Sequence, residues 1–233
     1  MPLPKIDLPL FEVSLPSTGE KVMLRPYTVK EEKILLVAQE SDESGSELIA
    51  TKQVVGNCLF EKNLDDLPLF DMEFLMLQLR ARSVDNKMEF RITDPDTEEL
   101  IDLELQIDDV KLTEDPKHTK EIKLNDDYTL FLKYPSMDTM IVIADMQADD
   151  PMVPYNIMVN CLDYIASEDE IEHFKDYTDE EITTFMDGIP TRDLKKITDF
   201  FETSPKLRHE IKYKNNTGKE RTFVIEGNRS FFI

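Results

Sequence analysis

The sequence predicts an α+β fold, with a mainly helical body that carries an N-terminal β-hairpin, an inserted small antiparallel sheet and a C-terminal β-hairpin. Three observations support this prediction. Apolar residues recur at helical spacing before residue 84 and again between residues 137 and 201, their period changes to two in between, and both ends alternate around a turn. We expect a single domain, residues 1–233, made of an N-terminal hairpin with helices (1–85), an inserted small sheet (86–134), a helical part (135–205) and a basic hairpin with a tail (206–233).

A hairpin and a capped helix open the chain. Residues 11–15 alternate between apolar and polar side chains, a PSTG turn follows, and residues 21–24 resume the alternation, which is typical of a hairpin with one buried face. Thr28 and Glu31 then have the spacing of a capping box, in which each side chain bonds an amide that the first helical turn leaves free. We therefore expect a helix from about Val29 to Gln39.

The helical spacing and the period of two also predict the helices and strands of the middle region. Helices are expected at 45–62 and 69–83, and the second has apolar side chains on nearly every face, so it must be buried or docked. The segments KMEFRIT, LIDLELQI and YTLFLKY alternate with period two and are interpreted as three strands of one small sheet. The polar residues 108–120 are interpreted as a loop.

Helical spacing returns after the sheet. We expect helices at 137–147 and 154–166, a third behind a second capping box formed by Thr178 and Glu181, and a fourth around residues 194–201. The chain then alternates over 207–213, turns at NNTG and continues as RTFVIE, which predicts a terminal hairpin rich in Lys and Arg.

Composition indicates a folded, highly ionised protein. Of the 233 residues, 40% are apolar and 33% are charged, and the formal net charge is −22. Nucleic acid is not an expected partner, because affinity for phosphate backbones depends on Lys and Arg. The N-terminus lacks the pattern of a signal peptide and no run of 18 apolar residues occurs, so we expect no membrane partner and a cytoplasm-like compartment.

The charge is unevenly distributed. Residues 145–181 hold twelve acids against Lys175 alone, whereas 206–229 hold seven bases against three acids. This pattern predicts an acidic face and a basic end that orient partners, although it is also compatible with a solvated helix face and a Lys-rich strand edge that blocks aggregation. The candidate partner-binding residues are Arg208, Lys212, Lys214, Arg221, Phe231 and Phe232.

Two apolar features leave alternatives open. The two phenylalanines in RSFFI either plug the groove of a partner or fold back across the sheet. The many methionines around the apolar helices serve either as an adaptable docking surface or as core filler.

The residues that usually carry chemistry form no recognisable pattern. His118, His173 and His209 belong to no metal motif, and Cys58 and Cys161 lie in apolar patterns that are typical of reduced core cysteines. Phosphate-binding and nucleophile motifs such as GxxxxGK[ST], GxGxxG and GxSxG do not occur.

One acidic motif imitates a metal site. Asp94, Asp96 and Glu98 match the first positions of a calcium loop, but Glu99 stands where glycine is required, so a hairpin turn is favoured. We therefore expect no enzyme, no metal, no cofactor and no small-molecule substrate. A hydrolase with carboxylates in a cleft between the helical body and the sheet is the catalytic alternative, and no nucleophile or metal motif supports it.

Both ends of the chain nevertheless resemble a known family. The N-terminal match rests on Leu15-Pro16-Ser17-Thr18-Gly19, Arg25-Pro26, Val29-Lys30-Glu31-Glu32-Lys33 and Ala38-Gln39-Glu40-Ser41. The C-terminal match rests on Tyr213-Lys214-Asn215-Asn216, Gly218-Lys219-Glu220-Arg221, Glu226-Gly227 and Phe231-Phe232. These segments resemble the baseplate proteins of T-even-type contractile-tailed bacteriophages, the family that contains the baseplate hub subunit and the hub assembly catalyst.

The resemblance implies a role in assembly and carries no catalytic residue over to this chain. It implies a structural component of the baseplate hub that contacts other hub or tail proteins, or alternatively a non-structural, chaperone-like factor that promotes hub assembly. The expected location is the virion tail baseplate, after assembly in the host cytoplasm.

Overall fold

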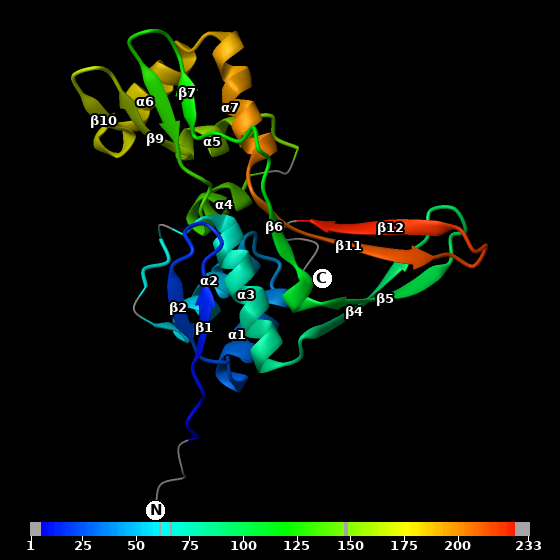
Figure 1. Cartoon of the computed structure of the whole chain (residues 1–233). Helices are drawn as coiled ribbons and strands as arrows, with labels where there is room; N and C mark the ends of the chain where they lie inside the picture. Colours follow the sequence, from blue (N-terminus) through cyan, green and yellow to red (C-terminus); the bar gives the residue numbers. More distant parts are fainter. Residues whose placement is uncertain (1–5, 61, 66, 147–148, 227–233) are drawn as a thin grey trace, which may run out of the picture. The chain divides into compact units, whose positions relative to one another are not determined.

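The structure is a computed structural model that describes residues 6–60, 62–65, 67–146 and 149–226. Its contacts divide the chain into two compact units (Figure 1). The first unit comprises residues 1–113 and 206–233, and the second comprises residues 114–205. The predicted organisation as a single domain in four parts stays a prediction.

The first unit combines three α-helices with hairpins from both ends of the chain. Its elements are β1 (Phe11–Ser14), β2 (Lys21–Leu24), α1 (Val29–Gln39), α2 (Ser46–Cys58), β3 (Leu59–Phe60), α3 (Leu69–Ser83), β4 (Lys87–Thr93), β5 (Leu100–Gln106), the 3-10 helix η1 (Ile107–Asp109), β6 (Lys111–Thr113), β11 (Lys206–Lys214) and β12 (Glu220–Glu226). They form the antiparallel sheets β1-β2-β3, β4-β5 and β12-β11-β6.

The predicted N-terminal hairpin and first helix are confirmed. Strands β1 and β2 pair with Val13 opposite Val22, and the PSTG turn closes at Gly19, whose φ of 71° lies in the left-handed region that glycine tolerates. Helix α1 spans the predicted residues and begins with the predicted capping box. The local sequence therefore determined this region.

Glu31 is the buried centre of this capping box. Its carboxylate accepts hydrogen bonds from the Thr28 amide (2.9 Å) and hydroxyl (2.7 Å), and it pairs with the Arg25 guanidinium at 3.0 Å. Burial opposes ionisation, but the hydrogen bonds from Arg25 and Thr28 outweigh it and lower the pKa of Glu31 to about 2. The Arg25 amide also donates a hydrogen bond to the Cys58 carbonyl, so Arg25 joins the end of β2 to the end of α2.

Helix α3 is buried, as its sequence predicts. Met72, Leu75 and Leu77 are almost fully enclosed, and the helix also buries the carboxylate of Asp71. Asp71 accepts hydrogen bonds from the amide and hydroxyl of Ser17, which ties the PSTG turn to the start of α3. Burial raises the pKa of Asp71. Several methionines of the apolar helices are core residues, including Met72, whereas Met152 in the second unit is exposed.

The second unit surrounds a four-stranded antiparallel sheet of order β10-β9-β8-β7 with helices. Its elements are β7 (Glu121–Lys123), β8 (Thr129–Leu132), α4 (Met137–Ala144), α5 (Val153–Asn160), β9 (Leu162–Ala166), β10 (Ile171–His173), the 3-10 helix η2 (Phe174–Asp176), α6 (Asp179–Asp187) and α7 (Thr191–Thr203). Its core contains Leu130, Leu132, Leu162, Ile197 and Phe200. The second predicted capping box, Thr178 with Glu181, is present at the start of α6.

The predicted mainly helical body with hairpins and one small sheet is wrong. Within the described residues the chain has 38% helix and 28% strand, with seven α-helices and four sheets. The KMEFRIT and LIDLELQI segments pair as β4 and β5, but YTLFLKY contributes β8 to the sheet of the second unit. Pairing partners distant in the chain decide which sheet a strand joins, and alternation alone does not identify those partners.

A second error concerns residues 154–166, which we predicted as one helix. Helix α5 ends at Asn160, and residues 162–166 form β9 between β8 and β10. The apolar residues of β9 are compatible with either periodicity, because a short, covered strand shows little alternation. The expected loop at 108–120 likewise contains β6 and overlaps the end of η1.

Two further sequence expectations can be compared with the structure. Cys58 and Cys161 are free and buried, which confirms them as reduced core residues. Among the described residues, the helices are too short or too polar to cross a lipid bilayer.

We predict that replacing Glu31 with Gln lowers the free energy of unfolding by about 3 kcal/mol at pH 7, because the Arg25 charge loses its buried partner. The folded pKa of Glu31 is depressed from 4.5 to about 2. Its contribution is therefore complete above the unfolded pKa and is lost as the pH falls towards 2. Urea denaturation followed by circular dichroism at pH 7, 4 and 3 should show the two proteins converging.

The matched control is Glu43→Gln, which removes an exposed carboxylate close to the same helix. This change should leave stability within about 0.5 kcal/mol of the wild type. An equal loss in both variants, or a Glu31→Gln deficit that stays constant down to pH 3, would contradict the assignment.

Candidate protein interface

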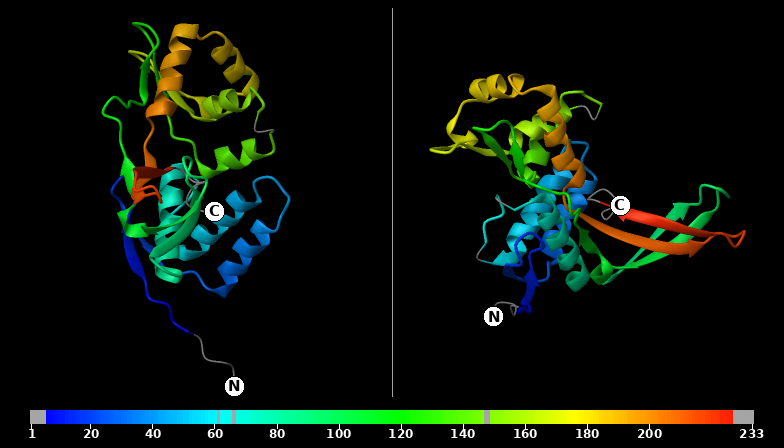
Figure 2. Two further views of the ribbon diagram at one scale, coloured as in Figure 1. Left: turned by 90° about the vertical axis from the view of Figure 1, so that its right-hand side faces the viewer. Right: turned by 45° about the horizontal axis from the view of Figure 1, so that its top comes forward.

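The first unit carries an arm made of two stacked hairpins, β4–β5 and β11–β12. Figure 1 and Figure 2 show the two hairpins running side by side away from the helices of this unit. Their facing sides are apolar, and the rings of Phe90 and Phe223 lie 5.7 Å apart between them. The apolar layer includes Met88, Phe90, Leu105, Leu207, Ile211, Phe223 and Ile225. An isolated two-stranded hairpin is marginally stable, so each hairpin depends on the other.

A buried carboxylate joins the tips of the two hairpins. Asp94 ends the β4 side of the first turn and accepts hydrogen bonds from the Tyr213 hydroxyl (2.8 Å) and the Asn215 side chain (3.4 Å). The amides of Asp96 and Thr97 also donate to it, both at 3.1 Å. Burial opposes its ionisation, yet these donors together lower the pKa of Asp94 to about 2.

Ion pairs reinforce the same junction. Lys219 lies 2.8 Å from Asp96, and Arg221 pairs with the other oxygen of that carboxylate. The Lys219 hydrogen bond and the Arg221 charge lower the pKa of Asp96. The Asn216 side chain donates to Glu99 across the tips. The acidic DPDT turn therefore holds the hairpin tips together.

The structure separates the predicted partner-binding residues of the C-terminal hairpin. Arg208, Lys212 and Lys214 alternate along the face of β11 that points away from β4–β5. Arg221 lies on the opposite face, opposite Tyr213, where it contacts Asp96. Arg221 therefore does not share a surface with the other three bases.

Most bases of the outer face have acidic neighbours. Arg208 pairs with Glu210 at 2.7 Å, and Lys214 pairs with Glu220 at 3.5 Å. Lys212 lies between them opposite Thr222, and no ion pair of its side chain is found within the described residues. Phe231 and Phe232 lie outside the described residues. The partner-binding role of these six residues stays a prediction.

The acidic surface that the sequence predicts belongs largely to the second unit. Residues 114–205 carry 22 Asp and Glu against eight Lys and Arg, so this unit holds −14 of the net charge of −22. It also contains a pocket of ≈ 650 Å³, which we call the acidic pocket. The pocket is lined by Leu124, Asn125, Tyr128, Ile165, Glu172, Phe174, Tyr177, Glu181, Ile182, Thr184, Phe185, Gly188, Ile189, Pro190, Arg192 and Asp193.

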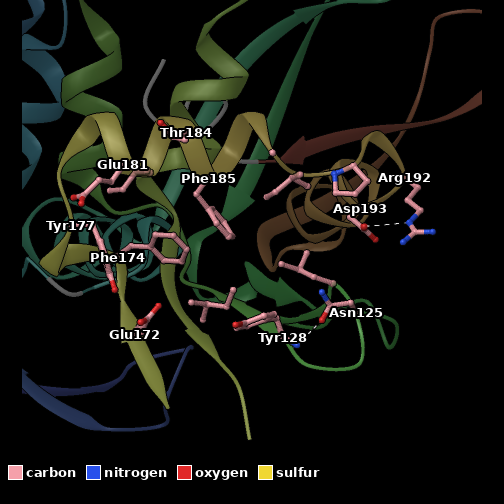
Figure 3. Close-up of a pocket in the computed structure, with 16 residues that line it drawn as sticks. Asn125, Tyr128, Glu172, Phe174, Tyr177, Glu181, Thr184, Phe185, Arg192 and Asp193 are labelled. Carbon is pink, nitrogen blue, oxygen red and sulfur yellow. Dashed lines mark hydrogen bonds and ion pairs between the residues drawn. The ribbon is translucent and has the colours of Figure 1, made fainter. Parts of the chain in front are cut away.

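Figure 3 shows how the elements surround the acidic pocket. Phe185 from α6 faces Tyr128 from the β7–β8 turn, and Glu172, Tyr177 and Glu181 gather at one end. Both tyrosine side chains are substantially exposed. Partial burial and the neighbouring Glu172 raise the pKa of Tyr177. This end of the pocket therefore combines aromatic rings with negative charge.

The other end of the pocket carries no net negative charge. The carboxylate of Asp193 is almost fully buried and pairs with Lys196 at 2.7 Å and with Arg192 at 3.4 Å. The Lys196 and Arg192 contacts lower the pKa of Asp193. Electrostatic attraction for a cation is thus concentrated at the Glu172 end.

The sequence indicates only part of this pocket, through the helical spacing of Ile182, Phe185 and Ile189. Ile182 and Phe185 of α6 and the following Ile189 are half-buried and line the pocket. The pocket forms because residues 124–193 bring the β7–β8 turn, β10 and α6 together. Such a convergence of distant segments has no signature in local spacing.

His118 and the two cysteines, which lie outside the pocket, make structural contacts or are buried in the core. His118 contacts the Thr203 hydroxyl and the Tyr134 hydroxyl, both at 2.9 Å, and burial lowers its pKa. Burial raises the pKa of Cys58 to about 11 and that of Cys161 to about 12. Within the part of the chain that the structure describes, no group of three or more His, Cys, Asp or Glu is arranged to hold a metal ion.

We predict that Asp94→Ala releases the hairpin tips from one another, because Tyr213, Asn215 and two amides lose their common acceptor. Hydrogen–deuterium exchange measured by mass spectrometry should accelerate in residues 93–100 and 213–219. Exchange in α3 should stay unchanged.

Asp102→Ala is the control for the arm prediction. Asp102 pairs with Arg91 on the exposed side of β4–β5, where an ion pair contributes little. This variant should exchange like the wild type at both tips. Equal acceleration in the two variants would rule out Asp94 as the junction.

Residues 8–233 match the model of a family described as T4 bacteriophage base plate protein. Neither the curated proteins nor the solved structures contain a match. The family implies a phage baseplate-associated role, a location at the tail baseplate and interaction with other phage proteins. Since the match spans almost the whole sequence, this chain belongs to the T4 bacteriophage base plate protein family.

Proposed function

We propose that the chain is a structural component of the baseplate hub in a contractile phage tail and that it acts through protein–protein contacts during tail assembly. The observation that carries this proposal is the family match over residues 8–233. The match supports a baseplate role for the whole chain, because it includes both the arm and the second unit.

The arm supports a scaffolding role. Its two hairpins share one apolar layer and a hydrogen-bonded tip, so the outer faces are presented in a fixed arrangement. The outer face of β11–β12 alternates bases and acids, which favours partners with a complementary charge order over partners of a single sign. Such a surface contributes orientation more than affinity.

We further propose that the chain transforms no substrate. The two thiols are buried and their pKa values are raised, so little of the reactive thiolate forms near neutral pH. The buried carboxylates Glu31, Asp94 and Asp193 are occupied by structural donors. These groups support a binding protein rather than a catalyst.

A non-structural, chaperone-like factor for hub assembly is the second candidate. The observation in its favour is the acidic pocket, which leaves apolar side chains accessible within a strongly negative unit. A factor of this kind holds a partner segment temporarily, and its high charge keeps the free chain soluble.

Quantitative mass spectrometry separates the two candidates. If the chain is a structural component, purified virions should contain it at a fixed ratio to other baseplate proteins. If it is an assembly factor, tail precursors from infected cells should contain it and finished virions should not.

The purification needs its own control. A capsid protein and an abundant host cytoplasmic protein, measured in the same samples, define full retention and contamination. Detection of the chain only at the contamination level in finished particles would refute the structural proposal.

A further inference from the structure

We propose that the acidic pocket of one copy binds residues 227–233 of a second copy, so that the chain self-associates from tail to pocket. This inference is independent of the hub assignment, because it concerns the purified chain alone. The occupant is a short segment of this same sequence.

The pocket has the chemistry of a site for a basic and aromatic segment. Its interior is formed by half-buried apolar side chains, including Ile165, Ile182 and Phe185. A volume of ≈ 650 Å³ lies within the range of pockets that enclose compact ligands. The interior therefore offers burial to large apolar side chains.

The Glu172 end of the pocket adds a preference for a cation. Glu172 and Glu181 supply two carboxylates beside the exposed rings of Tyr128 and Tyr177 (Figure 3). Carboxylates attract a guanidinium group, and tyrosine faces attract it further through the ring quadrupole. The neighbouring Asp176 adds to the negative potential.

Residues 227–233, with the sequence GNRSFFI, carry the complementary groups. They contain no acid in a chain of 49 acids, and Arg229 is followed closely by Phe231 and Phe232. Arg229 would meet the carboxylates while the phenylalanines fill the apolar interior. Charge complementarity thus favours this segment over the rest of the acidic chain.

Each copy offers one pocket and one segment, so the contact is heterologous and generates rings or open chains. The net charge of −22 on every copy opposes close approach. We therefore expect weak association in dilute solution that strengthens where many copies gather.

The first experiment measures binding of the isolated segment. A fluorescently labelled peptide GNRSFFI, blocked at both ends, is titrated with the full chain that carries Phe231→Ala and Phe232→Ala, so that its own segment does not compete. Fluorescence anisotropy should show saturable binding that weakens as salt is raised. A peptide with both phenylalanines replaced by Ala should bind at least tenfold more weakly.

Pocket variants test where the peptide binds. Glu172→Gln should weaken binding at least threefold, and Tyr128→Ala should do the same while circular dichroism remains that of the wild type. Glu202→Gln is the matched control, because Glu202 is an exposed acid of the same unit that does not line the pocket. Its effect should stay within twofold.

Sedimentation velocity of the wild-type chain tests whether the pocket is occupied by residues 227–233 of a second copy. The sedimentation coefficient should rise with protein concentration, and the rise should disappear in the Phe231→Ala/Phe232→Ala variant. Failure of the peptide to saturate, equal effects of Glu172→Gln and Glu202→Gln, or a wild-type chain that stays monomeric at concentrations where the peptide binds would each overturn the proposal. None of these results depends on the presence of the chain in virions.

Discussion

The structure depends on carboxylates that are buried and fully supplied with donors. A carboxylate out of water costs several kcal/mol unless hydrogen bonds and a counter-charge offset that cost. Glu31 satisfies this condition with Thr28 and Arg25, and Asp94 with Tyr213 and Asn215. In each case the constraint joins segments that would otherwise be separate, so the same residue type that makes the surface acidic also fixes the interior.

Acidic and basic residues are arranged differently in the two units. In the arm of the first unit, acids and bases alternate and pair, which leaves a rigid and nearly balanced outer face. In the second unit, acids outnumber bases and surround an open apolar pocket. A baseplate protein with these properties combines one surface suited to orientation with another suited to capture of a short basic segment.

The segments that resemble the phage baseplate proteins, which we call the N-terminal and C-terminal signatures, contribute several of these structural contacts. Ser17, Arg25 and Glu31 of the N-terminal signature make the buried hydrogen bonds of the first unit. Asn215 of the C-terminal signature holds the arm together through Asp94, and Arg221 does so through Asp96. These residues of the two signatures therefore act in the fold, and their contacts by themselves indicate no binding site.

The sequence by itself determined the features whose cause is local. The capping boxes of α1 and α6, the turn at Gly19 and the burial of α3 follow from residues a few positions apart, and each was predicted correctly. Only the tertiary structure decided which strands pair, where the helix predicted at 154–166 changes to β9, and which half-buried side chains of α6 border a pocket. These outcomes depend on partners far away in the chain, and the free energy of such long-range contacts leaves no periodic trace in the residues that form them.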